Sequence, residues 1–123
     1  MRTDTIHGHP VLFLDEEGPA ISTPDDAADL VGSAWFEHAT LIAVPVARLD
    51  PEFFRLETRR AGEIIQKLVN YRLQLAVIGS IEEHVAASGA LRDFVWESNR
   101  GEHVWFLPDD AALEAKLATR PTE

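Results

Sequence analysis

Leu41–Val46 (Leu-Ile-Ala-Val-Pro-Val) and Leu73–Ile78 (Leu-Gln-Leu-Ala-Val-Ile) are two short apolar runs in the middle of the chain. Because they lack a strict alternation of apolar and polar residues, they are typical of strands that are covered on both faces. The segment between them starts with the helix signal Asp50-Pro51-Glu52 and carries apolar residues at helical spacing to about Asn70, which predicts the longest helix of the chain. A strand, a helix and a second strand within 40 residues predict a right-handed crossover between two parallel strands.

The residues before this unit predict a hairpin and a first helix. Pro10–Leu14 and Ala20–Ser22 are prone to form strands and flank an acidic turn with glycine and proline, which favours an antiparallel hairpin. Thr23-Pro24-Asp25-Asp26 then supplies an N-cap hydroxyl, a proline at the first helical position and two acids in the first turn. The helix should end near His38. Its predicted buried face comprises Ala27, Leu30, Val31, Ala34 and Trp35.

Three further elements are predicted after Ile78. A loop rich in Ser, Gly and Glu leads to a short helix over about 90–100, which Gly101 closes. His103–Leu107 is the last predicted strand, and Asp109 opens a final helix. The order β-β-α-β-α-β-α-β-α predicts an α/β fold with a mixed, largely parallel sheet of about five strands and about four helices.

The composition is that of an acidic chain without cysteine. The 123 residues include 21 Asp and Glu against 11 Lys and Arg, which gives a net charge of −10. Binding to nucleic acid needs an excess of basic residues, so we expect no nucleic-acid partner. No uncharged apolar run approaches the roughly 18 residues that cross a bilayer, so we also expect a cytoplasmic protein without a membrane partner. One domain is expected over residues 1–123, with an ordered core at about 10–118.

Sequence motifs for a catalytic or cofactor site are absent. The chain has no phosphate-binding loop, no dinucleotide-binding glycine motif and no serine-nucleophile motif. His7 and His9 are two positions apart, but no other histidine stands at metal-ligand spacing from them. We therefore expect no catalytic residue, no metal and no cofactor.

A first group of polar residues lies in the segment 51–72, which has five basic and three acidic residues. Six charged or amide residues of this segment recur at steps of three and four and would share one face of a continuous helix. These residues are Glu52, Arg55, Arg59, Glu63, Gln66 and Asn70. Such a stripe is either a solvated helix face or a ridge that docks an acidic partner or a second copy of the chain.

A second group lies in the predicted helix 90–100. Arg92, Trp96 and Asn99 share one face of this helix, with Glu97 and Arg100 beside them. Tryptophan is a frequent interface anchor, which favours contact with a partner. In a cleft, Glu97 would serve as acid or base with an arginine as anion clamp. A purely structural or capping role is the third interpretation.

Three blocks of the chain resemble one protein family. They are Phe53–Thr58, Ala61–Lys67 with Asn70 and Tyr71, and Arg92–Gly101. On these blocks the chain is similar to an uncharacterised bacterial family catalogued as domain of unknown function 4180, and the similarity spans Val11–Leu117. Members usually carry a glycine and an apolar residue at the positions of Arg59 and Arg60. The resemblance implies no established activity.

The order of elements also resembles that of STAS domains, the small regulatory modules of the sigma-factor antagonist type. Those domains present a phosphorylatable serine at the start of the helix after the third strand. The corresponding segment Leu49–Phe54 has no hydroxyl residue, and the next one along the chain is Thr58. The resemblance therefore implies the architecture without the usual phosphorylation site.

Two functional hypotheses follow. In the first, the protein is a small, non-enzymatic STAS-like interaction or regulatory module that binds a protein partner and associates with itself as a homodimer. Trp96 and one of Trp35 or Phe36 would anchor the contact. Its orientation would be fixed by Arg55, Arg59, Glu97, Asn99 and Arg100. In the alternative, it is a small-molecule-binding protein or small enzyme with one cleft between helices 51–70 and 90–100. That cleft would be lined by Glu63, Gln66, Arg92, Glu97 and Asn99.

Overall fold

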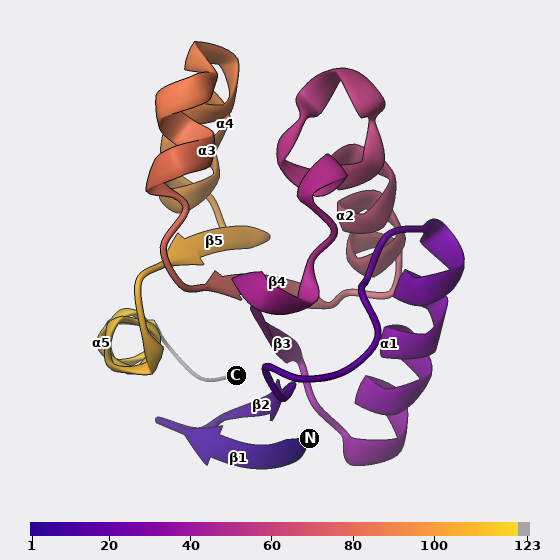
Figure 1. Ribbon diagram of the computed structural model, residues 1–123. Coiled ribbons are helices and arrows are strands. Elements are labelled where there is room, and N and C mark those ends of the chain that lie inside the picture. Colours follow the sequence, from indigo (N-terminus) through magenta and orange to yellow (C-terminus); the bar gives the residue numbers. More distant parts are fainter. Residues whose placement is uncertain (121–123) are drawn as a thin grey trace.

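One five-stranded sheet organises residues 1–120, which are the residues that the computed structural model describes (Figure 1). Its strands are β1 (Arg2–Ile6), β2 (His9–Phe13), β3 (Leu41–Pro45), β4 (Gln74–Ile78) and β5 (Val104–Leu107). They lie in the order β1-β2-β3-β4-β5. β1 is antiparallel to β2, and all other neighbours are parallel. The predicted parallel pair is confirmed, with Leu41 beside Gln74 and Pro45 beside Ile78.

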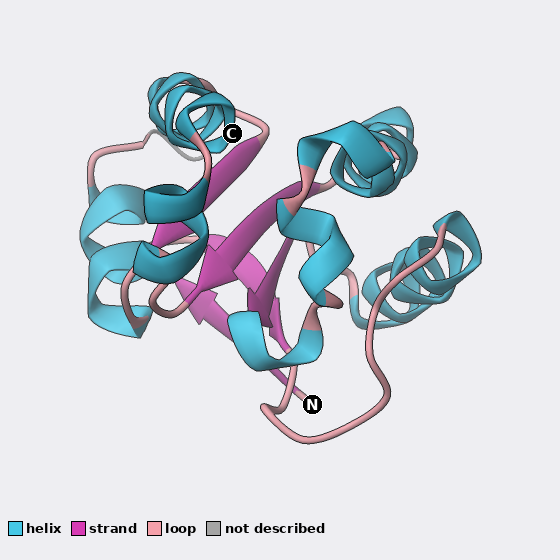
Figure 2. Cartoon of the chain, turned by 45° about the horizontal axis from the view of Figure 1, so that its top comes forward, coloured by secondary structure: helices cyan, strands magenta, loops and turns pink. Residues whose placement is uncertain are grey.

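Helices cover both faces of this sheet (Figure 2). They are α1 (Pro24–Glu37), α2 (Arg60–Asn70), α3 (Glu82–Ala87), α4 (Gly89–Arg100) and α5 (Asp110–Ala118). Each crossover joins neighbouring parallel strands, so right-handed connections place α1, α2 and α4 on the same face. α5 follows the last strand and packs on the opposite face. The predicted α/β class, the mixed sheet and the alternation of strands and helices are confirmed, with the short α3 as an addition.

The core has two layers that meet in the central strands. Leu12, Ile42 and Leu75 point toward α1, α2 and α4. Leu41 and Ala76 point to the other face, where Leu113 and Leu117 of α5 cover them. β3 is therefore buried on both sides over residues 41–44, as the unbroken apolar run predicted.

The predicted first helix begins as expected but buries fewer aromatic side chains. The Thr23 hydroxyl accepts a hydrogen bond from the Asp26 backbone N–H at 3.2 Å, and Asp26 in turn accepts from the Thr23 N–H at 3.0 Å, which forms a capping box. The prediction that Trp35 is buried is wrong: its side chain is 70% exposed, and that of Phe36 is 83% exposed. Consecutive helical residues point about 100° apart, so only Ala34 in this last turn faces the sheet.

The predicted hairpin between Pro10–Leu14 and Ala20–Ser22 is wrong. The hairpin lies earlier, where β1 and β2 meet through a turn at His7 and Gly8 with φ values of 48° and 83°. β1 is a polar, exposed strand, so hydrophobic periodicity does not reveal it. Ile21 instead forms a single parallel bridge to Leu49.

The predicted long helix over 51–70 is also wrong, because nearly half of this segment lies before α2 and contains two short 3₁₀ helices, Pro51–Phe54 and Leu56–Thr58. Phe53 and Phe54 are both buried and pack edge to face with ring centres 5.2 Å apart, which one helical face does not allow. The Thr58 hydroxyl donates to backbone carbonyls of this segment. Arg59 has a left-handed backbone with φ of 65°, so α2 starts only at Arg60 and α1 is the longest helix.

The segment after β4, expected as a loop, contains α3. This short helix packs on α4, and its His84 ring stacks on Phe54 with centres 4.2 Å apart. Ser88 then begins α4 by accepting a hydrogen bond from the Leu91 N–H at 3.1 Å.

The side chain of Asn99 fastens α4 to β5. Its carbonyl oxygen accepts from the Phe106 N–H at 2.7 Å, and its amide nitrogen donates to the Phe106 carbonyl at 3.2 Å. The backbone carbonyl of Asn99 also accepts from the Lys116 ammonium of α5 at 2.8 Å. One residue thus holds a strand and two helices together.

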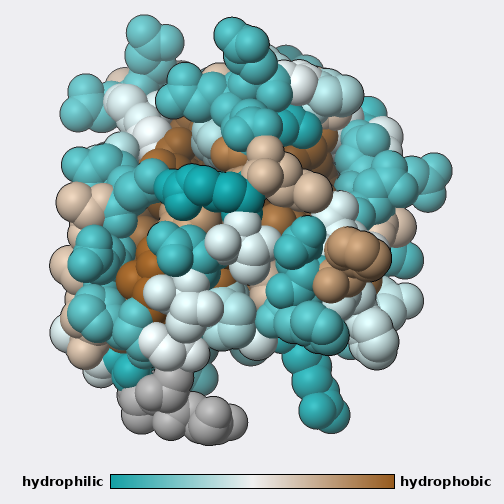
Figure 3. Space-filling view, turned by 90° about the horizontal axis from the view of Figure 1, so that it is seen from below, coloured by the Kyte–Doolittle hydropathy of each residue, from teal (hydrophilic) through white to brown (hydrophobic). Residues whose placement is uncertain are grey.

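The surface is mainly polar. Figure 3 shows one face on which hydrophobic side chains are visible mostly in hollows between hydrophilic ones. The large apolar side chains that are exposed include Trp35, Phe36, Tyr71 and Trp96. Within residues 1–120, no helix combines the length and the apolar character that a membrane crossing requires.

Replacing Asn99 with alanine should lower the free energy of unfolding by about 1–3 kcal/mol, because both polar groups of Phe106 lose their partner. Asn99→Asp keeps the acceptor for the Phe106 N–H but sets a carboxylate oxygen against the Phe106 carbonyl, so we expect it to lose at least as much stability at pH 7. Urea unfolding at pH 7 measures both values. Equal stability of the alanine variant and the wild type would contradict this role of Asn99.

The Asp26 carboxylate should make stability depend on pH. Hydrogen bonds from the backbone N–H groups of Ser22 and Thr23 lower the pKa of Asp26 in the folded state. A lowered pKa means that the stabilisation is fully present above the unfolded value of about 3.9 and is lost as the pH falls through the folded value. We therefore expect Asp26→Asn to be less stable than the wild type at pH 7, and the difference to shrink below about pH 4. A difference that stays constant from pH 7 to pH 3 would argue against this assignment.

Candidate functional site

A groove runs between α2 and α4. α2 packs closely along α1 but makes few close backbone contacts with α4. Two adjoining hollows of about 690 and 430 Å³ lie on this side of α2, and both are lined by Gly62, Gln66 and Phe94. We call the two hollows together the α2–α4 groove. Its further lining includes Leu56, Arg59, Glu63 and Asn70 in the larger hollow, and Ile65, Glu97, Ser98, Glu102 and His103 in the smaller one.

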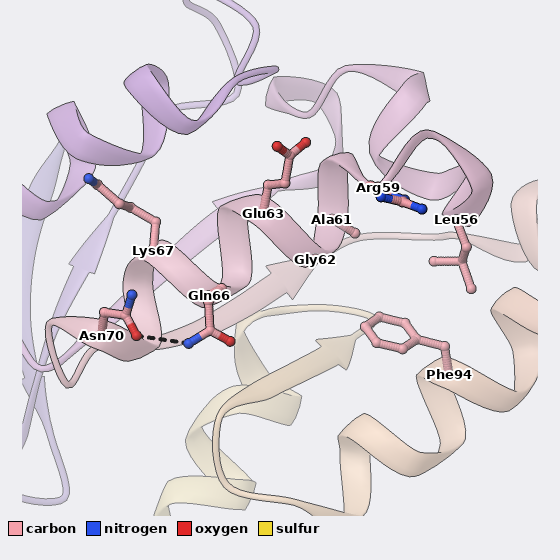
Figure 4. A pocket seen from close by; sticks show the side chains of 9 residues that line it. All are labelled: Leu56, Arg59, Ala61, Gly62, Glu63, Gln66, Lys67, Asn70 and Phe94. Carbon is pink, nitrogen blue, oxygen red and sulfur yellow. Dashed lines mark hydrogen bonds between the residues drawn. The ribbon is translucent and has the colours of Figure 1, made fainter.

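The floor of the groove is apolar because both helices turn their largest side chains toward the sheet. Ile64 and Leu68 of α2 are fully buried beneath it, and Ile65 is half-buried on the α4 side. Phe94 packs edge to face on Phe106 of β5, with ring centres 6.0 Å apart. In Figure 4 the Phe94 ring projects from α4 toward α2, and Leu56 lies above it.

Gly62 is the residue that keeps the middle of the groove open. It lies inside α2, is exposed, and a Cβ added to it would meet no atom within 4 Å. Glycine inside a helix costs about 1 kcal/mol relative to alanine. No atom of residues 1–120 packs closely enough on Gly62 to require a glycine there, so the result of this residue is a stretch of helix backbone that no side chain covers.

The rim of the groove carries hydrogen-bonding and charged groups. The Gln66 amide donates to the Asn70 side-chain oxygen at 2.8 Å, as the dashed line in Figure 4 marks. Arg59 and Glu63 point in different directions in the same view. Within residues 1–120, neither of them takes part in an ion pair. The charged groups that line the groove are Arg59, Glu63 and Lys67 in the larger hollow and Glu97 and Glu102 in the smaller one, so cations and anions are both available to an occupant.

The polar stripe predicted for the segment 51–72 does not lie on one helix. Arg55 lies outside the groove and pairs with Glu52 at 3.3 Å and with Glu57 at 3.4 Å. The left-handed residue Arg59 separates these side chains from α2. Arg59, Glu63, Gln66 and Asn70 do lie together, all on the larger hollow.

The second predicted group is divided in the same way. Glu97 lines the smaller hollow, whereas Asn99 uses both polar atoms of its amide to hold β5. Trp96 is 59% exposed on α4, with the Arg100 guanidinium 4.4 Å from its ring centre. Arg92 is exposed and lies 3.9 Å from Asp93.

The proposed anchors and the proposed cleft residues are therefore only partly brought together. Trp35 and Phe36 lie on α1, which is on the other side of α2 from α4, so they do not form one surface with Trp96 (Figure 1). Glu63 and Gln66 line the larger hollow, and Gln66 and Glu97 line the smaller one, so only Gln66 belongs to both. Sequence reasoning missed Leu56 and Phe94 as lining residues, and a glycine in a strongly helical segment was the available signal for the opening.

The groove is suited to binding an apolar body with a polar margin. The carboxyl groups whose pKa the structure lowers are Asp15, Asp26 and Asp50, and all three lie outside it. No group of three or more His, Asp or Glu side chains within residues 1–120 is placed to hold a metal ion. What the geometry offers is shape, apolar surface and a few hydrogen-bonding groups.

Comparison with known proteins identifies the family. No curated protein and no solved structure matches the chain. A family model described as domain of unknown function (DUF4180) matches residues 6–117, which include the whole sheet from β2 onward and all five helices up to Leu117. The three blocks Phe53–Thr58, Ala61–Lys67 with Asn70 and Tyr71, and Arg92–Gly101 lie inside this match. The chain therefore belongs to the DUF4180 family of domains of unknown function.

Proposed function

We propose that this protein is a non-enzymatic interaction or regulatory module, STAS-like in the order of its elements, that recognises a protein partner through the α2–α4 groove. The observation that carries this proposal is the open, apolar groove with Gly62 at its centre. Exposed apolar hollows with a polar rim are typical of surfaces that bind another molecule.

The shape of the groove favours a helix or an extended peptide of a partner. On its other side α2 already packs against a helix, α1. On the α4 side, where Gly62, Ile65 and Gln66 line the groove, α2 makes few close contacts with another helix. A partner helix that presents residues at spacings of three and four could lie in this space in the way amphipathic helices enter grooves.

A small-molecule ligand is the second candidate. The larger hollow, at about 690 Å³, falls within the roughly 300–1,000 Å³ of typical ligand sites. Its lining is mainly apolar, with a few polar groups from Arg59, Glu63, Gln66 and Asn70 that would orient a ligand. The two candidates use the same groove, so one set of variants tests both.

Filling the groove should abolish recognition without unfolding the protein. In Gly62→Trp the new side chain would extend into the middle of the groove from a position where an added Cβ meets no atom within 4 Å. Gly32→Trp is the matched control: Gly32 is also exposed within a helix, α1, with no atom within 4 Å of an added Cβ. Affinity capture from an extract of the cells that produce the protein, with all three forms as bait, is the measurement.

We expect a protein that the wild type and Gly32→Trp retain and Gly62→Trp does not. A thermal-shift screen of metabolites on the same three forms tests the second candidate. A shift that Gly62→Trp alone abolishes, without any captured protein, would favour a small-molecule ligand. If the captured proteins are the same for all three forms and no metabolite shifts the Tm, the groove has no recognition role.

A further inference from the structure

We propose that the partner of the α2–α4 groove is a second copy of this chain, with the two α2 helices crossing antiparallel about a two-fold axis at Gly62. This inference rests on the proposed function, because it names the occupant of the same groove. It draws on the position of Gly62, on the order of the charges around it and on the absence of ion pairs at those charges.

Gly62 marks the point where two helices can approach most closely. Side chains normally keep helix axes 8–10 Å apart, and a glycine at the crossing point removes that barrier on both sides of a two-fold axis. Because the Cβ position of Gly62 is open, the backbone of a second helix has room there. A symmetric contact at Gly62 would thus explain a glycine that no contact within the chain explains.

The charges beside Gly62 are arranged for antiparallel self-pairing. Arg59 precedes the glycine and Glu63 follows it, and both belong to the exposed side of the α2 segment. In an antiparallel pair centred on Gly62, Arg59 of each copy lies opposite the Glu63–Gln66 segment of the other. The contact therefore contains two equivalent ion pairs, and each guanidinium also comes within reach of a Gln66 amide.

A parallel pair would not have this complementarity. It would place Arg59 beside Arg59 and Glu63 beside Glu63, and like charges at close range are repulsive. Antiparallel helices also set the positive end of one helix dipole beside the negative end of the other. The charge order along α2 therefore selects one relative direction of the two copies.

Charge reversal tests the pairing directly. We expect sedimentation equilibrium to show a wild-type dimer at micromolar to millimolar concentration. Arg59→Glu and Glu63→Arg should each raise the dimer dissociation constant at least about tenfold, because each creates two like-charge contacts. The double variant Arg59→Glu/Glu63→Arg should return to within about threefold of the wild type, since the pairs are re-formed with exchanged signs. Arg92→Glu, which makes the same charge change on α4, should leave the constant within about twofold.

Alanine substitutions at Gly62 and, as a control, at Gly32 test whether the two α2 helices approach each other closely at Gly62. Gly62→Ala and Gly32→Ala should both raise the Tm, because alanine is the better helix former. Only Gly62→Ala should weaken the dimer, and a variant that is more stable yet less associated excludes unfolding as the cause.

A monomer over the whole concentration range, or a dimer that is insensitive to both single reversals, overturns this inference. A monomeric wild type that still captures a different protein, which Gly62→Trp loses, overturns the second-copy partner alone and leaves the proposed function in place. Loss of both results removes the groove as a recognition surface.

Discussion

The parallel hydrogen-bonded ladder between β3 and β4 is the constraint on which the rest of the structure depends. Residues 41–45 pair in register with residues 74–78, and the side chains of this pair supply the centre of both core layers. A parallel pair needs a crossover, and the right-handed crossover fixes α2 on one face of the sheet. The neighbouring crossovers add α1 and α4 beside it, so the groove between α2 and α4 is a consequence of this ladder.

The pattern of apolar residues predicts the strands and helices that pack in the core. It fails where backbone hydrogen bonds or the local backbone conformation determine the secondary structure. The strands at 41–45 and 74–78 and the cap at Thr23 were predictable because burial and hydrogen bonding act on neighbouring residues there. β1 has exposed polar side chains and exists through its ladder with β2, a contact that periodicity does not record. The left-handed backbone at Arg59 breaks an otherwise helical pattern, and its residue type gives no sign of it.

The candidate site was predictable in its residues and not in its shape. Helical spacing identified Glu63, Gln66 and Glu97 as outward-facing, and the structure places them on one groove. Spacing along single helices does not say how far apart two helices lie, so the apolar floor made by Phe94 and Leu56 was missed. Spacing also does not show whether a side-chain amide is already hydrogen-bonded within the protein. Asn99 was therefore grouped with binding residues, although its side chain holds β5.

The hydrogen bonds of the Asn99 side chain also affect whether another strand can add to the sheet at β5. β5 is the last strand; His103 and Leu107 turn their carbonyls to β4, so the Phe106 N–H and carbonyl face outward. Those two groups would otherwise be a template for a strand of another molecule, the usual route to sheet extension and to aggregation. By occupying both, the Asn99 amide blocks the addition of a strand at Phe106. A strand that adds along β5 must therefore displace the Asn99 amide, whereas β1, the polar strand at the other edge of the sheet, has no such restraint within residues 1–120.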